Sequence, residues 1–344
     1  MKKGVKIVIF VAIGMVVLGM GMAFVAMASG GFDMKKLAST KNYMLKTYDV
    51  ADTFVNINLD IDSESVKVVE SYDDNTHFEC YESSSDRYDV KVDGDTLKVK
   101  SIRKPGITEW FNFGVTEPAK LYLPKEEYED FTAKLGSGSF EMETKLALED
   151  VEIKVGSGSI RLGNLQADDI VANTNSGSIK ADQITAKSAD LHSGSGSVKC
   201  SNCEIQTQLK AASNSGSITA EKITCSALDL KSGSGSINAT NVECDTDFTA
   251  DTSSGSVNMD NVVSKNTYKA KAGSGSVKIN SCDGADMDLQ SGSGSIKGTV
   301  KTPKMFNATS GSGSVKVPDD DANGGKLVAH TGSGSVNIEL DIVQ

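Results

Sequence analysis

Residues 189–240 read ADLHSGSGSVKCSNCEIQTQLKAASNSGSITAEKITCSALDLKSGSGSINAT. A Ser-Gly-Ser step followed by Ile or Val occurs three times in this stretch, and its glycines are Gly196, Gly216 and Gly235. The whole chain has eleven copies of this motif at intervals of 19 to 21 residues, the first with Phe140 in place of Ile or Val, and their glycines are at 138, 158, 177, 196, 216, 235, 255, 275, 294, 313 and 334. Eleven copies at one period indicate a repeat architecture and exclude a flexible Gly/Ser linker.

Apolar residues take fixed places around each repeat glycine. In the Gly235 repeat they lie seven and five residues before the glycine and two and seven after it, at Leu228, Leu230, Ile237 and Val242. The position four after is usually apolar too, and Lys, Asp, Asn, Thr and Glu fill most places between. A period of two on both sides of the glycine predicts two short strands, each with one buried face.

One such coil cannot bury its apolar row alone, but coils stacked about 4.8 Å apart cover one another. We therefore predict an all-β, single-stranded β-solenoid (β-helix) of about 11 coils of 19–20 residues, on the order of 50 Å long. Each repeat glycine is expected to take a positive φ at a sharp corner, where a Cβ would clash. The serines beside it are expected to form a hydrogen-bonded ladder along the stack. Handedness stays open.

The first residues predict a membrane anchor. Lys2, Lys3 and Lys6 precede an uncharged run of 22 residues, 7–28, which is long enough to cross a hydrocarbon core of roughly 30 Å. The positive-inside preference places the N-terminus in the cytoplasm and the rest of the chain outside the membrane. The alternative is a signal peptide cleaved near Ala28 and a secreted protein.

Charge is distributed unevenly along the chain, whose net charge is −11. Residues 1–46 contain seven lysines and one acid, which leaves 28 Lys and Arg against 45 Asp and Glu in the remainder, a net charge of −17. Such a surface repels phosphate backbones, so we do not expect a nucleic-acid partner.

Residues 51–130 are rich in strand signals but lack the repeat. Residues 57–68 resemble a coil without its glycines, and Asp93-Gly94-Asp95 between two alternating runs predicts a hairpin. Trp110, Phe111 and Phe113 lie in a predicted loop, 103–118. This aromatic patch is expected to plug the open first coil, or else to face a membrane or a partner.

The chain resembles the bacterial putative-adhesin family, a domain-of-unknown-function group with a short N-terminal anchor. The resemblance rests on the opening strand 55–61, the Leu121-Tyr122-Leu123-Pro124 step and the GSGS-[IV] repeats, and it covers about residues 50 to 344. It implies an envelope-facing β-solenoid and supplies no catalytic residues.

Candidate catalytic and metal-binding residues do not form a recognisable site. His192 and His330 lie seven repeats apart, which is roughly 34 Å in a stack, and His77 lies in the N-terminal part. The densest acidic group, Asp319-Asp320-Asp321 with Asn323, predicts a solvated turn, with a weak calcium site as the alternative. We therefore expect no cofactor, no metal and no catalysis.

The six cysteines are interpreted as small buried residues. Cys200 and Cys203 occupy two inward positions, and there is no second pair at metal spacing. Cys225 and Cys244 both lie nine residues after their glycine in adjacent coils. They are therefore either buried thiols or a disulfide between coils.

Basic residues recur three positions after the repeat glycine. The sequence predicts two columns of charges about 5 Å apart, formed by Arg161, Lys180 and Lys199 and by Lys278, Lys297 and Lys316. They either bind an anionic envelope polymer such as a teichoic acid or are offset by acids five positions after the glycine.

These observations favour a non-catalytic, membrane-anchored cell-surface module, an adhesin or a cell-envelope binding or sensing protein. Its partner would be an envelope polymer or a surface protein, and the alternatives are a carbohydrate-active β-helix enzyme and a structural spacer. The expected organisation is a cytoplasmic stub (1–6), a transmembrane anchor (7–28), a linker (29–50), a β cap (51–130) and the solenoid (131–344).

Overall fold

The computed structural model describes residues 43–84, 86–103 and 117–341, and within them the protein is all-β with no helix. The N-terminal strands are β1 (Met44–Val50), β2 (Asn56–Ile61), β3 (Val66–Glu70), β4 (Thr76–Glu82), β5 (Asp86–Asp93), β6 (Thr96–Arg103), β7 (Ala119–Leu123), β8 (Asp130–Leu135) and β9 (Phe140–Met142). The repeat strands are β10 (Leu146–Val155), β11 (Ile160–Thr174), β12 (Ile179–Ser193), β13 (Val198–Ser213), β14 (Ile218–Ser232), β15 (Ile237–Cys244), β16 (Phe248–Thr252), β17 (Val257–Ala272), β18 (Val277–Ser291), β19 (Ile296–Val300), β20 (Lys304–Ser310), β21 (Val315–Lys316), β22 (Gly325–Thr331) and β23 (Val336–Leu340).

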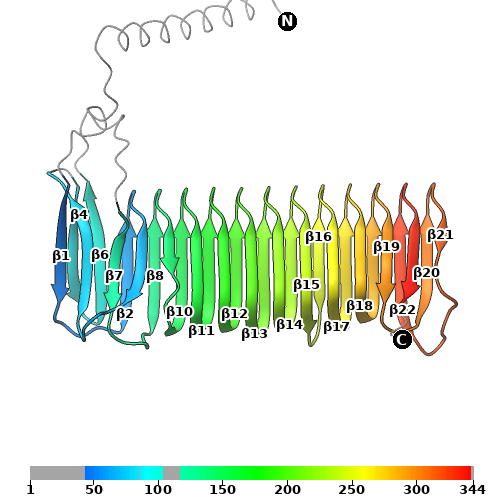
Figure 1. Cartoon of the computed structure of the whole chain (residues 1–344), viewed down its shortest axis with the longest axis horizontal. Coiled ribbons are helices and arrows are strands. Elements are labelled where there is room, and N and C mark those ends of the chain that lie inside the picture. The colour runs from blue at the N-terminus through cyan, green and yellow to red at the C-terminus, as the bar shows by residue number, and fades with distance from the viewer. Residues whose placement is uncertain (1–42, 85, 104–116, 342–344) are drawn as a thin grey trace, which may run out of the picture.

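The repeats stack as a parallel β-solenoid, which confirms the predicted fold class, with about 10 turns where about 11 coils were expected (Figure 1). Equivalent residues of successive coils are paired in register, so Ile160 lies beside Ile179 and Ile179 beside Val198. Each strand therefore forms backbone hydrogen bonds to a coil on either side, and the side chains of one sequence position form a row along the rod.

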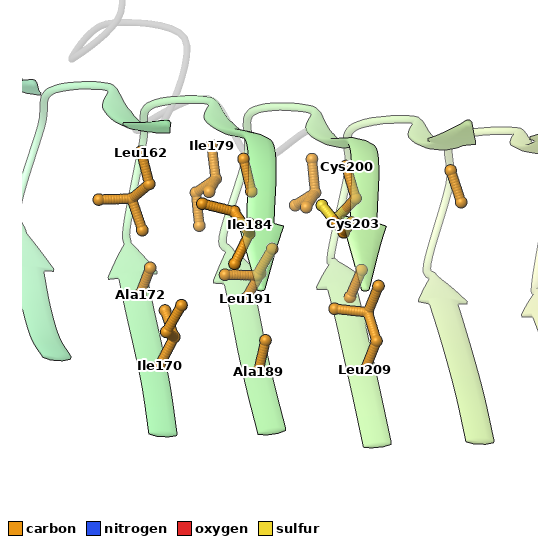
Figure 2. Packing of buried hydrophobic residues seen from close by; sticks show 14 of the residues in the cluster. Leu162, Ile170, Ala172, Ile179, Ile184, Ala189, Leu191, Cys200, Cys203 and Leu209 are labelled. Atoms are coloured by element: carbon orange, nitrogen blue, oxygen red, sulfur yellow. The ribbon is translucent and has the colours of Figure 1, made fainter. Parts of the chain in front are cut away.

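The core lies inside the coils, at the positions that the alternation predicts. Figure 2 shows stacked rows of these side chains in neighbouring coils. Ile179, Ile184 and Leu191 are each at most 2% exposed, and the next coil has Val198 beside Ile179 and Ala211 beside Leu191, both buried. Coils this narrow hold few aromatic residues, which accounts for the low aromatic content.

The repeat glycines are required by packing, and the predicted positive φ is wrong. Among the described glycines only Gly94 and Gly298 have a positive φ. A Cβ on Gly235 would instead lie 2.2 Å from the carbonyl oxygen of Gly216 in the preceding coil. The corners of adjacent coils thus touch through their backbones, and any side chain there would push the coils apart.

Left-handed backbone occurs at a second corner, six residues after the glycine, which the sequence analysis did not identify. Its φ values lie between 48° and 56°, at Asn164, Gln183, Asn202, Lys222, Asn241, Asn261 and Ser281. Four of these seven are Asn, the residue that tolerates this conformation best after glycine.

Two hydroxyl ladders hold the glycine corners together. In most coils the serine after the glycine accepts a hydrogen bond from the equivalent backbone N–H of the neighbouring coil, as from Ser256 to Ser236 at 3.2 Å, which confirms the predicted ladder. The second ladder is buried and lies three residues before the glycine. Its Ser232 hydroxyl donates to the Gly216 carbonyl at 3.0 Å and accepts from the Gly235 N–H at 2.9 Å.

The first coil in the sequence is not the first in the stack. Strand β2 lies between β6 and β8, and β3 lies between β7 and β9. The predicted hairpin is confirmed as the antiparallel pair β5–β6, with Asp93 opposite Thr96. Strand β1 pairs antiparallel with β4 and takes up residues 44–50, which the sequence analysis had assigned to the linker.

The last coil is also displaced, so the expectation that the repeats stack in sequence order is wrong at this end. Strand β22 lies between β18 and β20, and β23 lies between β19 and β21. The coil of Gly313 is therefore the outermost, and the coil of Gly334 sits inside it (Figure 1). Residues 318–324 lie in the connection from β21 of the outermost coil to β22, which is one layer closer to the middle of the rod.

Candidate functional site

A row of mostly basic residues runs along one side of the rod. Arg161, Lys180 and Lys199 are register partners on β11, β12 and β13, as the sequence predicts. Their neighbours in sequence point into the core, so all three side chains point outward and are about half exposed. The fold thus places the three cations at intervals of one strand spacing.

The row continues toward the N-terminus through residues that the sequence analysis missed. Glu141 is the register partner of both Arg161 and Lys67, and Lys67 is also paired with Lys120. We name these residues the basic row: Lys120, Lys67, Glu141, Arg161, Lys180 and Lys199. Five cations and one acid therefore occupy six successive layers.

Acidic residues form one close ion pair with the basic row, and their other contacts to it are longer than hydrogen bonds. Lys67 forms a close ion pair with Glu141. Arg161 lies 3.7 Å from Glu141, measured between Nη1 and Oε2, and Lys180 and Lys199 lie 3.6 to 3.7 Å from carboxylate oxygens of the rows beside them. These distances exceed hydrogen-bond length, and exposed pairs of this kind are worth at most about 1 kcal/mol.

The second predicted column is interrupted. Lys278 and Lys297 are register partners, but Asn337 lies between Lys297 and Lys316. The prediction that the three lysines are adjacent is therefore wrong, because the coil of Gly334 lies in the stack between the coil of Lys297 and the coil of Lys316. Lys316 pairs with Glu339 at 3.2 Å.

An acidic groove occupies a different strand of the same coils. Asp130, Asp150 and Asp169 are register partners there, and they help to line a groove of about 590 Å³. Burial and then the charges of Asp130 and Asp169 raise the pKa of Asp150 above its usual value. Three acids therefore follow one another on this strand of successive coils, away from the strand that carries the basic row.

The acidic turn near the C-terminal end caps a strand edge. Asp320 Oδ1 accepts a hydrogen bond from the Phe306 N–H at 2.7 Å, and the Asp321 N–H donates to the Lys304 carbonyl at 3.1 Å. Among the described residues no group of three or more His, Cys, Asp or Glu side chains is placed to hold a metal ion. The turn that was expected is present, and its carboxylates interact with backbone.

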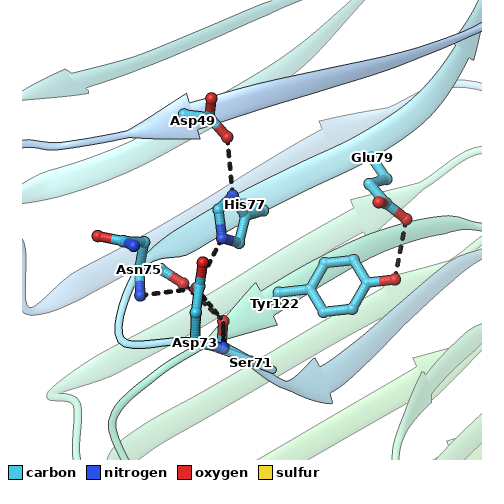
Figure 3. A network of polar contacts seen from close by, with 7 residues as sticks. All are labelled: Asp49, Ser71, Asp73, Asn75, His77, Glu79 and Tyr122. Carbon is cyan, nitrogen blue, oxygen red and sulfur yellow. Dashed lines mark hydrogen bonds and ion pairs between the residues drawn. The ribbon is translucent and has the colours of Figure 1, made fainter.

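A buried histidine in the cap was not singled out by the sequence. Figure 3 shows His77 held between two carboxylates, with Nδ1 2.8 Å from Asp49 and Nε2 2.8 Å from Asp73. The Tyr72 ring stacks on the imidazole at 5.1 Å between centroids. The hydrogen bond to Asp73 raises the pKa of His77, and the same bond lowers the pKa of Asp73 to about 2. This charged cluster fastens β1 and the β3–β4 turn to β4.

The cap contains a second carboxyl group with a shifted pKa, that of Glu64. Glu64 lines a small pocket of about 150 Å³ together with Asp86 and Arg103. Burial, and then the charge of Asp86, raises the pKa of Glu64 to about 7. The pocket is therefore sensitive to pH near neutrality.

The cysteines are buried, free thiols. Cys200 and Cys203 are core residues, as predicted, and burial raises the pKa of the Cys203 thiol to about 11. Cys225 and Cys244 are register partners with their sulfur atoms 3.7 Å apart. The two sulfurs are thus in contact without a bond.

Two predicted features fall outside the described residues. The aromatic patch of Trp110, Phe111 and Phe113 lies in 104–116, and the predicted anchor lies in 1–42. Within the residues that the structure does describe, no helix has the length and apolar character needed to span a membrane.

Fold and surface together define a parallel β-solenoid protein with a basic row and an acidic groove on its surface. A model of the Toastrack DUF4097 domain matches residues 54–214 and again residues 206–344. Because the two matches span most of the chain, this protein belongs to the Toastrack DUF4097 family, and the resemblance to the bacterial putative-adhesin family is confirmed.

Several solved structures are similar at low identity. A putative adhesin from Bacteroides fragilis is 14% identical, with a TM-score of 0.35 and coverage of 88% of this chain and 99% of that one. A putative lipid binding protein from Parabacteroides distasonis is 14% identical, with a TM-score of 0.38 and coverage of 87% and 98%. A putative cell adhesion protein from Clostridium sporogenes is 10% identical, with a TM-score of 0.21 and coverage of 87% and 100%. Likenesses this distant carry no functional argument, and no curated protein matches.

Proposed function

We propose that this protein is a non-catalytic, membrane-anchored rod at the cell surface that binds an extended anionic polymer of the cell envelope. The observation that carries the proposal is the basic row, in which five cations and the single acid Glu141 occupy six successive layers from Lys120 to Lys199. The uncharged run 7–28, with lysines before it, supports the anchor and an outward-facing rod.

Repulsion within the row favours an anionic ligand. Two unit charges one strand spacing apart in water repel each other by about 0.9 kcal/mol. This spacing is shorter than the Debye length of about 8 Å at physiological ionic strength, so salt does not remove the repulsion. A polyanion lying along the rod would neutralise several cations at once, and its weak contacts would add up to a salt-dependent affinity.

Binding of the full chain to isolated cell wall tests the proposal. The row variant replaces Lys67, Arg161, Lys180 and Lys199 with Gln. The control variant makes the same change in charge on a different strand of the coils, by replacing Lys154, Lys210, Lys231 and Lys269 with Gln. Both variants should keep the β signal of the wild type in circular dichroism, since exposed charges contribute little to stability.

We expect the wild type and the control variant to bind the wall and to weaken steeply as salt rises from about 50 to 200 mM. The row variant should bind far more weakly and lose most of the salt dependence. Wall stripped of its anionic polymer should bind neither the wild type nor the control. Equal binding by the row and control variants would reject the proposal.

The alternative of a carbohydrate-active enzyme has one observation in its favour, the acidic groove. Carboxylates with pKa values driven apart by their surroundings are the groups that glycoside hydrolysis requires. Release of soluble sugar from the same wall, lost on Asp150→Asn, would support this enzyme in place of the binding rod. The spacer alternative predicts neither binding nor release.

A further inference from the structure

Two of the six cysteines lie beside each other in adjacent coils. Cys225 on β14 and Cys244 on β15 are register partners, and their sulfur atoms lie 3.7 Å apart. Both residues are buried, with exposed fractions of 3% and 0%. Cys200, by contrast, lies between Ala181 and Ala220. Among the described strands, Cys225 and Cys244 are thus the one pair of cysteines in register.

The strand pairing places these two cysteines at a separation that a disulfide bond can bridge. Neighbouring strands bring equivalent Cα atoms about 4.8 Å apart, and disulfides join Cα atoms that are roughly 4.4 to 6.8 Å apart. A disulfide has a sulfur–sulfur distance of about 2.0 Å, so the two sulfur atoms must approach by about 1.7 Å from their present 3.7 Å. Rotation of the two side chains about their Cα–Cβ bonds supplies this approach without sliding one strand past the other.

Cys244 lies at the end of its strand, where the chain bends. Strand β15 ends at Cys244 and β16 begins at Phe248, whereas β14 runs without interruption through Cys225. The bend stays tied to the neighbouring coil, because the Asp245 N–H donates to the Cys225 carbonyl at 3.0 Å. The end of a strand adjusts to a new covalent bond with less disturbance of the ladder than its middle does.

The enclosed pair is poorly reactive once the chain has folded. The hydrogen bond with Cys225, and then burial, raise the pKa of the Cys244 thiol above its usual value. The thiolate is the nucleophile in disulfide chemistry, so a raised pKa leaves little of the reactive form. A disulfide between the two sulfurs therefore forms most readily as the chain folds, before stacking encloses them, and stacking then shields it from reductants.

We propose that Cys225 and Cys244 form a disulfide bond that joins two adjacent coils covalently when the chain folds in the presence of a disulfide oxidant. The thiolate of one cysteine attacks the oxidant, which forms a mixed disulfide and releases one thiol. The thiolate of the other cysteine then attacks the cysteine sulfur of the mixed disulfide and releases the second thiol. The protein loses two electrons and two protons, and the oxidant gains both.

The bond closes residues 225–244 into a covalent loop. Because each coil of a solenoid contacts only its neighbours, unfolding can otherwise begin between any two coils. A link between the coils of Gly216 and Gly235 prevents their separation and lowers the entropy of the unfolded chain. The oxidised rod should therefore unfold at a higher concentration of urea than the reduced rod.

Refolding of the full chain, solubilised in detergent, tests the proposal. The chain is unfolded in urea with a reductant and refolded with either a mixture of oxidised and reduced glutathione or reduced glutathione alone. Free thiols are then alkylated in urea, and the peptides are mapped by mass spectrometry. We expect the mixture to link the peptides of Cys225 and Cys244, with loss of the mass of two hydrogen atoms, and to leave the other four cysteines alkylated. Alkylation of Cys225 and Cys244 after refolding in the mixture would overturn the proposal.

Urea unfolding followed by circular dichroism measures the effect of the bond. The oxidised wild type should have a higher urea midpoint than the reduced wild type. Cys225→Ala should abolish this difference, because it leaves Cys244 without a partner. The control Cys203→Ala removes another buried cysteine and should keep the difference. Equal midpoints for the two forms of the wild type, or a difference that survives Cys225→Ala, would overturn the proposal.

A chain that does not refold is tested while folded, by incubation with oxidised glutathione at a urea concentration just below the unfolding midpoint. Local opening of the coils then admits the oxidant. The same link between the two peptides is expected, and its absence would overturn the proposal. Neither cysteine belongs to the basic row, so this test and that of polymer binding fail independently.

Discussion

Replacing Gly235 by Ala should destabilise the rod far more than replacing Ser236 by Ala beside it. The new Cβ would lie 2.2 Å from the Gly216 carbonyl oxygen, where ordinary contact begins at 3.4 Å, so the two coils must separate locally by about 1.2 Å. Separation breaks the bridge in which the Ser232 hydroxyl joins the Gly216 carbonyl to the Gly235 N–H.

The expected cost follows from these contacts. Two or three lost hydrogen bonds at about 1 kcal/mol each, and about 1 to 3 kcal/mol for overpacking, give a loss of roughly 4 kcal/mol. Ser236→Ala removes one acceptor, that of the Ser256 N–H, and should cost about 1 kcal/mol. Gly235→Val should cost more than Gly235→Ala because its bulk is larger.

Urea unfolding followed by circular dichroism measures both changes in the free energy of unfolding. In a solenoid each coil contacts only its neighbours, so hydrogen exchange should localise the damage of Gly235→Ala to the coils of Gly216 and Gly255. Equal losses for Gly235→Ala and Ser236→Ala would refute the argument from backbone contact.

Three further predictions concern the buried hydroxyl ladder, the cap and metal dependence. In the buried hydroxyl ladder, Ala272 occupies the position where the other coils from Thr174 onward have Ser or Thr. Ala272→Ser should therefore raise the urea midpoint of unfolding. Ser232→Ala removes a hydroxyl from the same ladder and should lower the free energy of unfolding by about 1–3 kcal/mol. Raised pKa values favour the protonated form in the folded state, so stability from Glu64 is present below about pH 4.5 and lost as pH rises through about 7. The contribution of His77 is present below about pH 6.5 and lost above it. Protection factors of the cap amides, which correct for the faster intrinsic exchange at higher pH, should therefore fall from about pH 5 to 8, and Glu64→Gln should flatten the lower part of this fall. Equal protection factors at both ends of the range would contradict the prediction. Addition of EDTA should leave the β signal in circular dichroism unchanged, and its loss would show that the fold needs a metal.

Much of the fold could be predicted because every coil repeats the same physical problem. Places such as Leu228 and Ile237 are apolar in nearly every copy, and a period of two fixes which side is buried. The role of Gly235 was predicted for the wrong reason, since a glycine required by positive φ and one required by a neighbouring backbone look alike in sequence. The left-handed corner was missed because Lys222 and Gln183 mask the preference for Asn.

The order of the coils at the two ends could not be predicted, because the pattern of apolar residues and glycines in a coil is the same whichever coil it stacks on. Lys304 gave no usable signal, because most other coils have a polar residue at its position, such as Asp168 or Lys187, and only the structure shows that Lys304 is buried. The same limit affected the basic row. Lys67 and Lys120 lie on coils without the repeat motif, and only register with Glu141 connects them to Arg161.

The enclosed position of the first coil has a mechanical consequence. A pulling force applied from the N-terminal side reaches β1 before the other described strands, and among these strands β1 is paired only with β4. Beyond it the force meets β2, whose two edges are held by β6 and β8. The load is thereby divided between two ladders of hydrogen bonds that must shear together. The outer strand should peel away at low force, while the rod behind it resists extension.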